Sequence, residues 1–233
     1  MNTIKTFICT VALLAASTMF AESCGMLPCR DCTLFPKSED GPGVIGKRYA
    51  EVGLRLQDPQ QYSDTSLAFG TSVNVPLCKH IDVGMGYSYD TQNYTPMGAT
   101  PDVVIDASSH NIGFDATIYN TIEKGIKPFL SFSLAHTASD VEFLGSNHNT
   151  NYQSWGVSAG AEFPFKWVSA ITSIGYNDDF KRSEYSTQAW VVKTEVNAWI
   201  TPKIGAYVSL AFVRPMHNYV SSYVWGTGAR FRF

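Results

Sequence analysis

The sequence predicts an all-β protein, an antiparallel up-and-down transmembrane β-barrel of ten strands, with eight strands as the second choice. Ten windows alternate apolar residues with small or polar ones, as strands between lipid and water require. None of the apolar positions in these windows carries a charge. The connections between windows also alternate between short and long, as in barrels with tight turns at one end and loops at the other. The windows are residues 50–56, 67–75, 81–89, 111–118, 130–135, 154–163, 168–176, 190–198, 204–212 and 223–233.

The first five windows place their apolar side chains on one face. In residues 81–89 the odd positions hold Ile, Val, Met, Tyr and Tyr, and the even positions hold Asp, Gly, Gly and Ser. The windows at 50–56, 67–75, 111–118 and 130–135 repeat this pattern. An Arg or Lys that faces lipid at mid-depth costs about 2–4 kcal/mol, so the exclusion of charge from the apolar face indicates a membrane-spanning strand.

The second half of the chain continues the pattern with one weak window. Residues 154–163, 190–198 and 204–212 alternate regularly. In residues 168–176 the alternation is disturbed because Ile171 lies on the parity expected to face the lumen. If this window and a neighbour were misread, eight strands would remain.

The last window is the most informative. Tyr223, Trp225, Phe231 and Phe233 share one face, while glycine and arginine occupy the other. This segment resembles the final strand of bacterial outer-membrane β-barrel proteins, of the small OmpA/OmpX-like or ten-stranded class without a periplasmic peptidoglycan-binding domain. The resemblance implies a location in the bacterial outer membrane, contact with its lipid and lipopolysaccharide, and recognition of the last strand by the barrel-assembly machinery.

The lengths of the connections between the windows are consistent with a barrel in an outer membrane. If the first strand runs outward from the periplasm, the short turns at 76–80, 120–125, 164–166 and 201–203 lie on the periplasmic side. The outer connections would be residues 90–106, 138–152, 178–185 and 215–220. Because function often concentrates in loops on a rigid scaffold, these outer loops are the predicted surface for a ligand.

Residues 1–23 have the layout of a secretory signal peptide: a short basic start, an apolar stretch at 7–16 and small residues before the expected cleavage site. Residues 24–46 are predicted to form a cysteine-containing periplasmic segment, and residues 47–233 the outer-membrane barrel. About 210 residues after cleavage suit one domain. The formal net charge of −3 argues against a nucleic-acid surface. No cofactor motif is present.

Four cysteines follow the signal peptide: Cys24, Cys29, Cys32 and Cys78. In an oxidising periplasm, disulfides within the N-terminal segment or to the barrel are the favoured interpretation. Four cysteines allow three pairings, which the sequence leaves open. A zinc site and intermolecular crosslinks, the latter as in cysteine-bearing envelope proteins of chlamydia-like bacteria, are the alternatives.

Nine charged residues of both signs lie on the face predicted to line the lumen. One interpretation is that they pair inside a narrow barrel, because an unpaired charge away from water is costly. The other is a hydrated path in which salt bridges open and close as a gate. A wide permanent pore is not expected of ten strands. The residues are Glu51, Arg55, Asp82, Asp115, Glu162, Lys193, Glu195, Arg230 and Arg232.

The predicted function is therefore a structural or surface-interaction role, with a narrow gated solute path as an option. The alternative is an outer-membrane barrel enzyme, a protease or a lipid-A-modifying acyl hydrolase or transferase, with a rim histidine. Such an enzyme would place a His within hydrogen-bond reach of Asp, Glu or Ser at the outer rim. The rim candidates are Asp90, Asp178, Asp179, His110, His148 and His217, and the pair His136 and Ser139.

Overall fold

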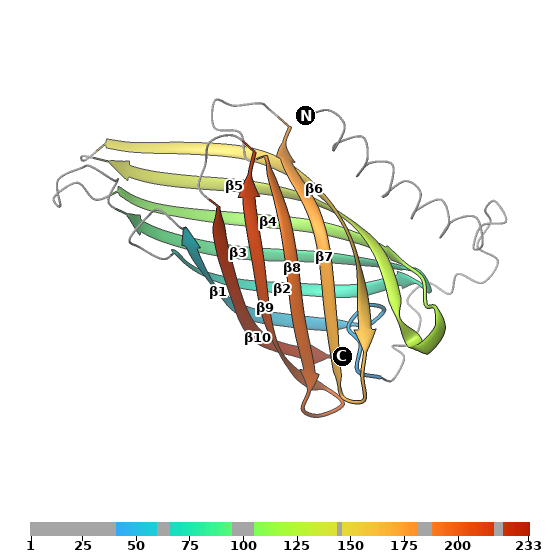
Figure 1. Ribbon diagram of the computed structural model, residues 1–233. Coiled ribbons are helices and arrows are strands. Elements are labelled where there is room, and N and C mark those ends of the chain that lie inside the picture. The colour runs from blue at the N-terminus through green and yellow to red at the C-terminus, as the bar shows by residue number, and fades with distance from the viewer. Residues whose placement is uncertain (1–40, 60–65, 95–104, 144–145, 181–187, 217–220) are drawn as a thin grey trace.

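A computed structural model of the chain describes residues 41–59, 66–94, 105–143, 146–180, 188–216 and 221–233. Ten antiparallel strands close into one barrel (Figure 1). The strands are β1 (Tyr49–Pro59), β2 (Ser66–Cys78), β3 (Ile81–Tyr94), β4 (Ile105–Tyr119), β5 (Lys127–Phe143), β6 (Ser146–Pro164), β7 (Val168–Asp179), β8 (Ala189–Trp199), β9 (Ile204–Pro215) and β10 (Ser222–Arg232). The predicted fold and the count of ten strands are confirmed.

Each strand pairs with its neighbours in sequence, and β1 pairs with β10 to close the sheet. The closing register runs from Tyr49 opposite Arg232 to Pro59 opposite Ser222. A closed sheet leaves no edge at membrane depth, where unpaired backbone N–H and C=O groups would have no water to bind. Among the described residues, no helix has both the length and the apolar character needed to cross a membrane.

The large apolar side chains point outward. Met85, Phe114, Leu134, Val208 and Trp225 are each more than half exposed, and they come from strands all around the barrel. Glycine, serine and charged residues alternate with them and point inward. The alternation predicted from the sequence is therefore the alternation of the fold, and its apolar side is the outer surface.

Two turns at the short-turn end are tight. A one-turn 3₁₀ helix at Glu123–Gly125 joins β4 to β5, with Lys124 at a φ of 61°. Phe165 donates its N–H to the carbonyl of Val168 at 2.7 Å and closes the turn from β6 to β7. These are two of the connections predicted to be short.

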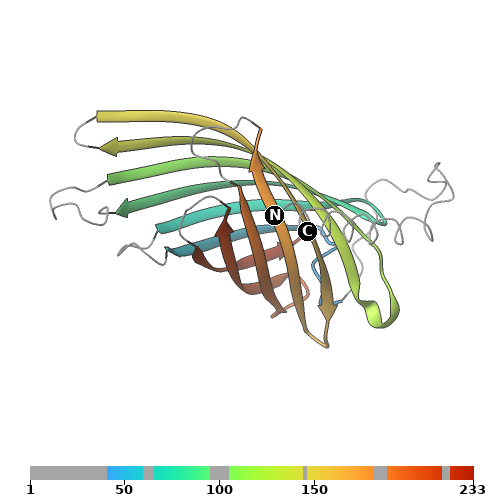
Figure 2. The same cartoon turned by 45° about the horizontal axis from the view of Figure 1, so that its top comes forward.

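The prediction of an outer loop at residues 138–152 is wrong. Most of it is strand, because β5 runs on to Phe143 and β6 begins at Ser146. Figures 1 and 2 show β3, β4, β5 and β6 extending beyond the other strands on the loop side. The sequence pattern missed these strand ends because the residues of β6 there are polar on both faces, so no apolar parity marks them.

Ile171 explains the weak window in β7. Its side chain packs against a buried cluster of Ile45, Tyr119 and Phe129 inside the barrel. An apolar side chain on the lumen parity is therefore covered by protein at this position. The alternation is disturbed here because Ile171 makes a contact inside the lumen. The strand itself is regular.

The outward apolar face generates the first prediction. Replacing Leu134 with Arg should lower the free energy of unfolding by about 2–4 kcal/mol, because the charge would face lipid near mid-depth. The matched control is Ala135→Arg, whose side chain would enter the lumen cavity. It should cost less than about 1 kcal/mol by the same reasoning. Urea titration of the protein refolded in lipid vesicles, followed by the heat shift on gels, measures both. Equal losses for the two variants would contradict the assignment of the faces.

Candidate functional site

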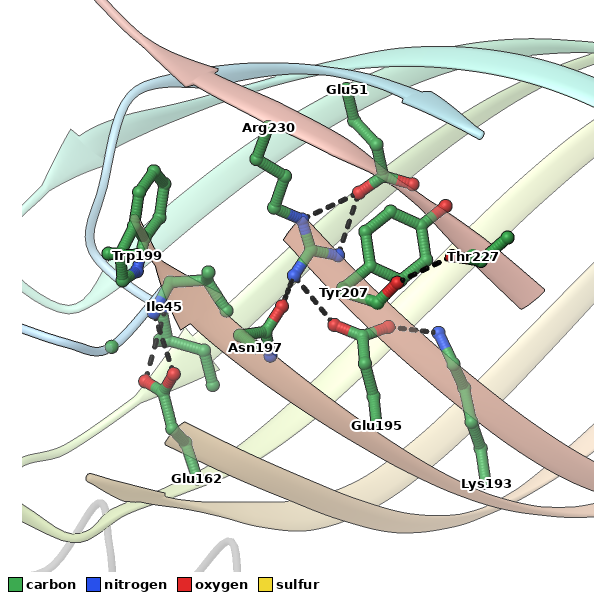
Figure 3. A network of polar contacts seen from close by, with 12 residues as sticks. Ile45, Glu51, Glu162, Lys193, Glu195, Asn197, Trp199, Tyr207, Thr227 and Arg230 are labelled. Atoms are coloured by element: carbon green, nitrogen blue, oxygen red, sulfur yellow. Dashed lines mark hydrogen bonds and ion pairs between the residues drawn. The ribbon is translucent and has the colours of Figure 1, made fainter. Parts of the chain in front are cut away.

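Arg230, on β10, lies inside the barrel near the short-turn end and is only 5% exposed (Figure 3). Its Nη2 is 2.7 Å from Glu51 Oε2, and its Nη1 is 2.7 Å from Glu195 Oε1. Its Nε also donates to Glu51 Oε2 at 2.8 Å, and its Nη1 donates to Asn197 Oδ1. One guanidinium is thus held by two carboxylates and an amide, which satisfies a charge that burial would otherwise penalise.

Two tyrosine rings lie against the same guanidinium. Arg230 Cζ is 4.4 Å from the ring centroid of Tyr207 and 5.1 Å from that of Tyr49, which is cation–π geometry. The Tyr207 ring needs the space above a glycine in the neighbouring strand. A Cβ on Gly228 would lie 2.7 Å from Tyr207 Cε1, so a larger residue there would displace the ring.

The Arg230 cluster, which we define as Glu51, Lys193, Glu195, Asn197 and Arg230, comes from three strands, β1, β8 and β10. Within β8, Lys193 Nζ forms an ion pair of 2.9 Å with Glu195 Oε2. Glu51 and Arg230 are directly opposite each other in the pairing of β1 with β10. The cluster therefore joins the two ends of the sheet across the line where the barrel closes.

Residues 41–48, which we call the inner segment, precede β1 and lie inside the barrel at its short-turn end (Figure 1). Val44 and Lys47 are buried there. Glu162, on β6, is fully buried and accepts two successive backbone N–H groups, from Val44 at 2.6 Å and from Ile45 at 3.2 Å. A carboxylate that receives adjacent amide donors fixes both the position and the direction of the chain.

A second carboxylate holds the next turn of the inner segment. Asp82, on β3, accepts the N–H of Gly46 at 2.7 Å. Asn74, on β2, donates to the carbonyl of Lys47 at 2.8 Å and to Asp82 at 3.2 Å. Gly46 has a φ of 81°, a conformation that favours glycine, so the chain can turn at this point toward β1.

Cationic and indole donors bind the carbonyl side of the same segment. They come from β5, from β8 and from β10, so the inner segment is held from several sides of the barrel. The distances are 2.6 Å from Lys127 Nζ to the carbonyl of Ile45, 2.7 Å from Trp199 Nε1 to that of Pro42, and 2.7 and 3.0 Å from Arg232 Nη2 to those of Gly41 and Gly43.

Apolar packing completes this end of the barrel. Ile45 of the inner segment is buried against Tyr119 and Phe129, and Ile171 packs on the same cluster. Figure 3 shows Ile45 lying between Glu162 and the strand that carries Trp199. The short-turn end of the lumen is therefore filled by protein, with the Arg230 cluster beside it.

A cavity of about 520 Å³ remains in the lumen. Eight of its 24 lining residues are glycine or serine, and Glu51, Arg55, Asp115 and Lys193 are the charged groups. Glu51 and Lys193 belong to the Arg230 cluster, so that cluster forms one boundary of the cavity. The cavity carries charges of both signs among small and apolar residues, and it has room for water or a small polar solute.

The structure thus sorts the nine predicted lumen charges into three groups. Four belong to the Arg230 cluster: Glu51, Lys193, Glu195 and Arg230. Three bind the inner segment: Asp82, Glu162 and Arg232. Two line the cavity: Arg55 and Asp115.

The other predicted sites are placed only in part. Cys78 is buried at the end of β2, at the short-turn end, while Cys24, Cys29 and Cys32 lie outside the described residues. The disulfides and the signal peptide therefore stay predictions. The outward aromatic face of β10 exposes the four predicted assembly residues: Tyr223, Trp225, Phe231 and Phe233.

The structure does not place the rim histidines beside an acid or a serine among the described residues. Tyr87 Oη lies 2.7 Å from His110 Nδ1 on the outer face, and His217 lies outside the described residues. His136 and Ser139 are three residues apart on β5, so their side chains point to opposite faces of the sheet. Within the described ranges, no hydrogen bond joins a histidine to Asp, Glu or Ser, and no group of three His, Cys, Asp or Glu side chains could hold a metal ion.

Sequence reasoning missed the inner segment and the neutral residues that face the lumen. Asn74 and Trp199 bind the inner segment and Asn197 binds Arg230, yet none of the three is charged. One signal was present. Phe129 and Ile171 are apolar residues on the lumen parity, close to the turns of one end. Apolar side chains facing a lumen at one end imply that protein covers them there.

Comparisons with known proteins address the fold. No protein-family model matches the chain. No curated protein matches its sequence. The transport unit of the autotransporter AIDA-I from Escherichia coli superposes with a TM-score of 0.50 at 10% identity, covering 94% of this chain and 97% of that one. The chain has the fold of outer-membrane β-barrel proteins.

Smaller barrels are also similar to this one. Neisserial surface protein A gives a TM-score of 0.41 at 16% identity over 80% of this chain and 96% of that chain. The N-terminal β-barrel domain of Pseudomonas aeruginosa OprF gives 0.39 at 14% identity over 80% and 98%. At these identities the comparisons concern the fold alone.

The Arg230 cluster generates the second prediction. Replacing Arg230 with Met should lower the free energy of unfolding by about 3–5 kcal/mol, because Glu51 and Glu195 would lose their buried counter-charge. Adding Glu51→Gln and Glu195→Gln to that variant should recover most of the loss, since no carboxylate then lacks a partner. Urea titration of the refolded barrel measures both variants. A triple variant no more stable than Arg230→Met would contradict this account of the cluster.

Proposed function

We propose that this chain is a bacterial outer-membrane protein whose barrel is a shut membrane anchor and whose role is interaction at the cell surface. The observation that supports it best is the difference between the two ends of the barrel. The short-turn end is filled by the inner segment and the Arg230 cluster. At the other end β3, β4, β5 and β6 project as a sheet beyond the rest of the barrel (Figure 2).

Three features support a location in the outer membrane. The outward face carries a band of large apolar side chains that a lipid bilayer would cover. The fold is that of outer-membrane barrels. Tyr87, Tyr89 and His110 form an outward aromatic group on β3 and β4, as expected where a barrel meets the lipopolysaccharide headgroups. The exposed aromatic face of β10 is the surface that we propose the barrel-assembly machinery recognises.

A gated solute path is the second candidate, and the inner segment favours it. This segment is held by side chains and not by strand pairing. Its departure would break no ladder of the barrel, and the cavity beside the Arg230 cluster would then gain an outlet. The two candidates differ in whether the inner segment stays in place under working conditions.

The third prediction tests the orientation of the barrel. A cysteine introduced by His148→Cys, on the projecting part of β6, should react with a membrane-impermeant maleimide on intact cells. The matched variant Thr201→Cys, in the turn from β8 to β9, should react only after the cells are lysed. The unaltered chain measures labelling of the native cysteines. The reverse pattern, or equal labelling of both variants on intact cells, would exclude the proposed orientation.

The fourth prediction separates the shut barrel from the gated one. In planar bilayers the unaltered protein should give no steady conductance, because the short-turn end of the lumen is filled. The variant Glu162→Ala with Asp82→Ala should give reproducible small steps, because it removes the two carboxylates that accept the N–H groups of the inner segment. The control is Asp140→Ala with Glu142→Ala, outside the lumen. Frequent openings of the unaltered protein would favour the gated path instead.

A further inference from the structure

Among the described residues, the longest stretch of strand that has a strand partner on one side only lies at the loop end of β6. Residues 146–153 of β6 pair with β5, from Phe143 opposite Ser146 to His136 opposite Gln153. On the other side β7 ends at Asp179, which is opposite Ser154. Figures 1 and 2 show this end of β6, in yellow, as the outer margin of the projecting sheet. All eight residues are exposed.

The backbone groups that face the open side can be assigned. Phe180 donates its N–H to the carbonyl of Gln153 at 3.0 Å, so the backbone of Gln153 points toward the β7 side. Backbone direction alternates along a strand in an antiparallel ladder. The N–H and C=O groups of Asn147, Asn149 and Asn151 therefore point to the open side, while those of the residues between them are bound to β5.

This edge lacks the features that usually prevent an edge strand from pairing with another strand. Exposed edge strands usually carry lysine, other charges, proline or a bulge, which prevent another strand from adding to them. Residues 146–153 read Ser-Asn-His-Asn-Thr-Asn-Tyr-Gln and contain no proline and no Asp, Glu, Lys or Arg. The pairing of β6 with β5 is continuous along them, without a shift of register. The edge is straight, uncharged and open to a further strand.

The neighbouring strands define the charge of an incoming partner. Glu142 is opposite Asn147 and Asp140 is opposite Asn149, so these carboxylates share the outward face with the amides of the edge. Among the described residues of the projecting part (90–94, 105–109, 138–143 and 146–153) there is no Lys or Arg. Asp140 and Glu142 are two residues apart on one face of β5, so a basic side chain placed over β6 would be attracted by both carboxylates.

We infer that residues 146–153 of β6 bind an extended, basic segment of another protein by strand addition. The backbone of the partner would pair with the open groups of Asn147, Asn149 and Asn151. Its alternate Lys or Arg side chains would reach over β6 toward Asp140 and Glu142, across about two strand spacings or roughly 10 Å. A second copy of this chain fits less well, because it would bring the same acidic face. The inference rests on the proposed surface role and assigns to it an extended, basic protein segment as the partner.

The fifth prediction tests strand addition with a defined probe. A fluorescent peptide of four Thr-Lys repeats should bind the full chain folded in detergent micelles, as followed by anisotropy, and a peptide of four Thr-Glu repeats should not. Asn149→Pro removes one open N–H while keeping the bonds to β5, because proline is accepted at an edge. It should weaken binding about tenfold. The matched control Asn149→Ala keeps that N–H and should bind within about twofold.

Further variants test the backbone pairing and the charge attraction separately. Asn147→Pro removes a different open N–H and should behave like Asn149→Pro. Asp140→Asn with Glu142→Gln should also weaken binding about tenfold and reduce its dependence on salt. Equal binding by the proline and alanine variants would overturn strand addition and leave only charge attraction. A protein that shows the heat shift of a folded barrel but binds no peptide would overturn the inference alone, whereas failure to insert into lipid would overturn the proposed function itself.

Discussion

The pairing of β1 with β10 is the constraint on which the rest of the structure depends. At membrane depth a sheet must close, because an open edge would leave backbone groups without hydrogen-bond partners. Closure in this register brings Tyr49 opposite Arg232, so the residues just before β1 start at the short-turn end of the barrel. From that position the inner segment can turn into the lumen at Gly46. Closure also sets Glu51 opposite Arg230, so an ion pair of 2.7 Å lies across the line of closure.

Two sets of residues occupy the short-turn end of the lumen, and they have different effects on the barrel. Arg230 contacts carboxylates from β1 and β8 and tyrosine rings from β1 and β9, so its loss would affect both the lumen and the closure of the sheet. The inner segment depends on a different set of groups, in which Glu162 and Asp82 receive backbone donors. The two devices are separable in principle, since removing the inner segment leaves the pairing of β1 with β10 intact. This separation is why we assign any movement of the lumen to the inner segment and a fixed role to the Arg230 cluster.

The sequence predicted the barrel well because lipid on one side and water on the other impose a two-residue period. Every window with that period became a strand, including the one that Ile171 disturbed. The pattern failed where the surroundings differ from that rule. At residues 138–152 water covers both faces of the sheet. The alternation therefore does not reveal that β5 and β6 extend into this region. At the short-turn end protein fills the lumen, so apolar Ile171 and neutral Asn74 face inward. A search restricted to charges could not find the inner segment that these two residues contact.

The two ends of β6 illustrate how one strand serves two environments. Near Glu162 it is paired on both sides and holds the inner segment, whereas beyond Ser154 it is paired on one side only. The second part is held straight by a long ladder with β5 that continues into the rigid barrel. An edge that is already ordered loses little conformational freedom when a strand adds to it, so most of the ordering cost falls on the incoming segment. In the surface role that we propose, the barrel would support a recognition surface built from backbone groups, because the ladder that orders this edge continues into the barrel.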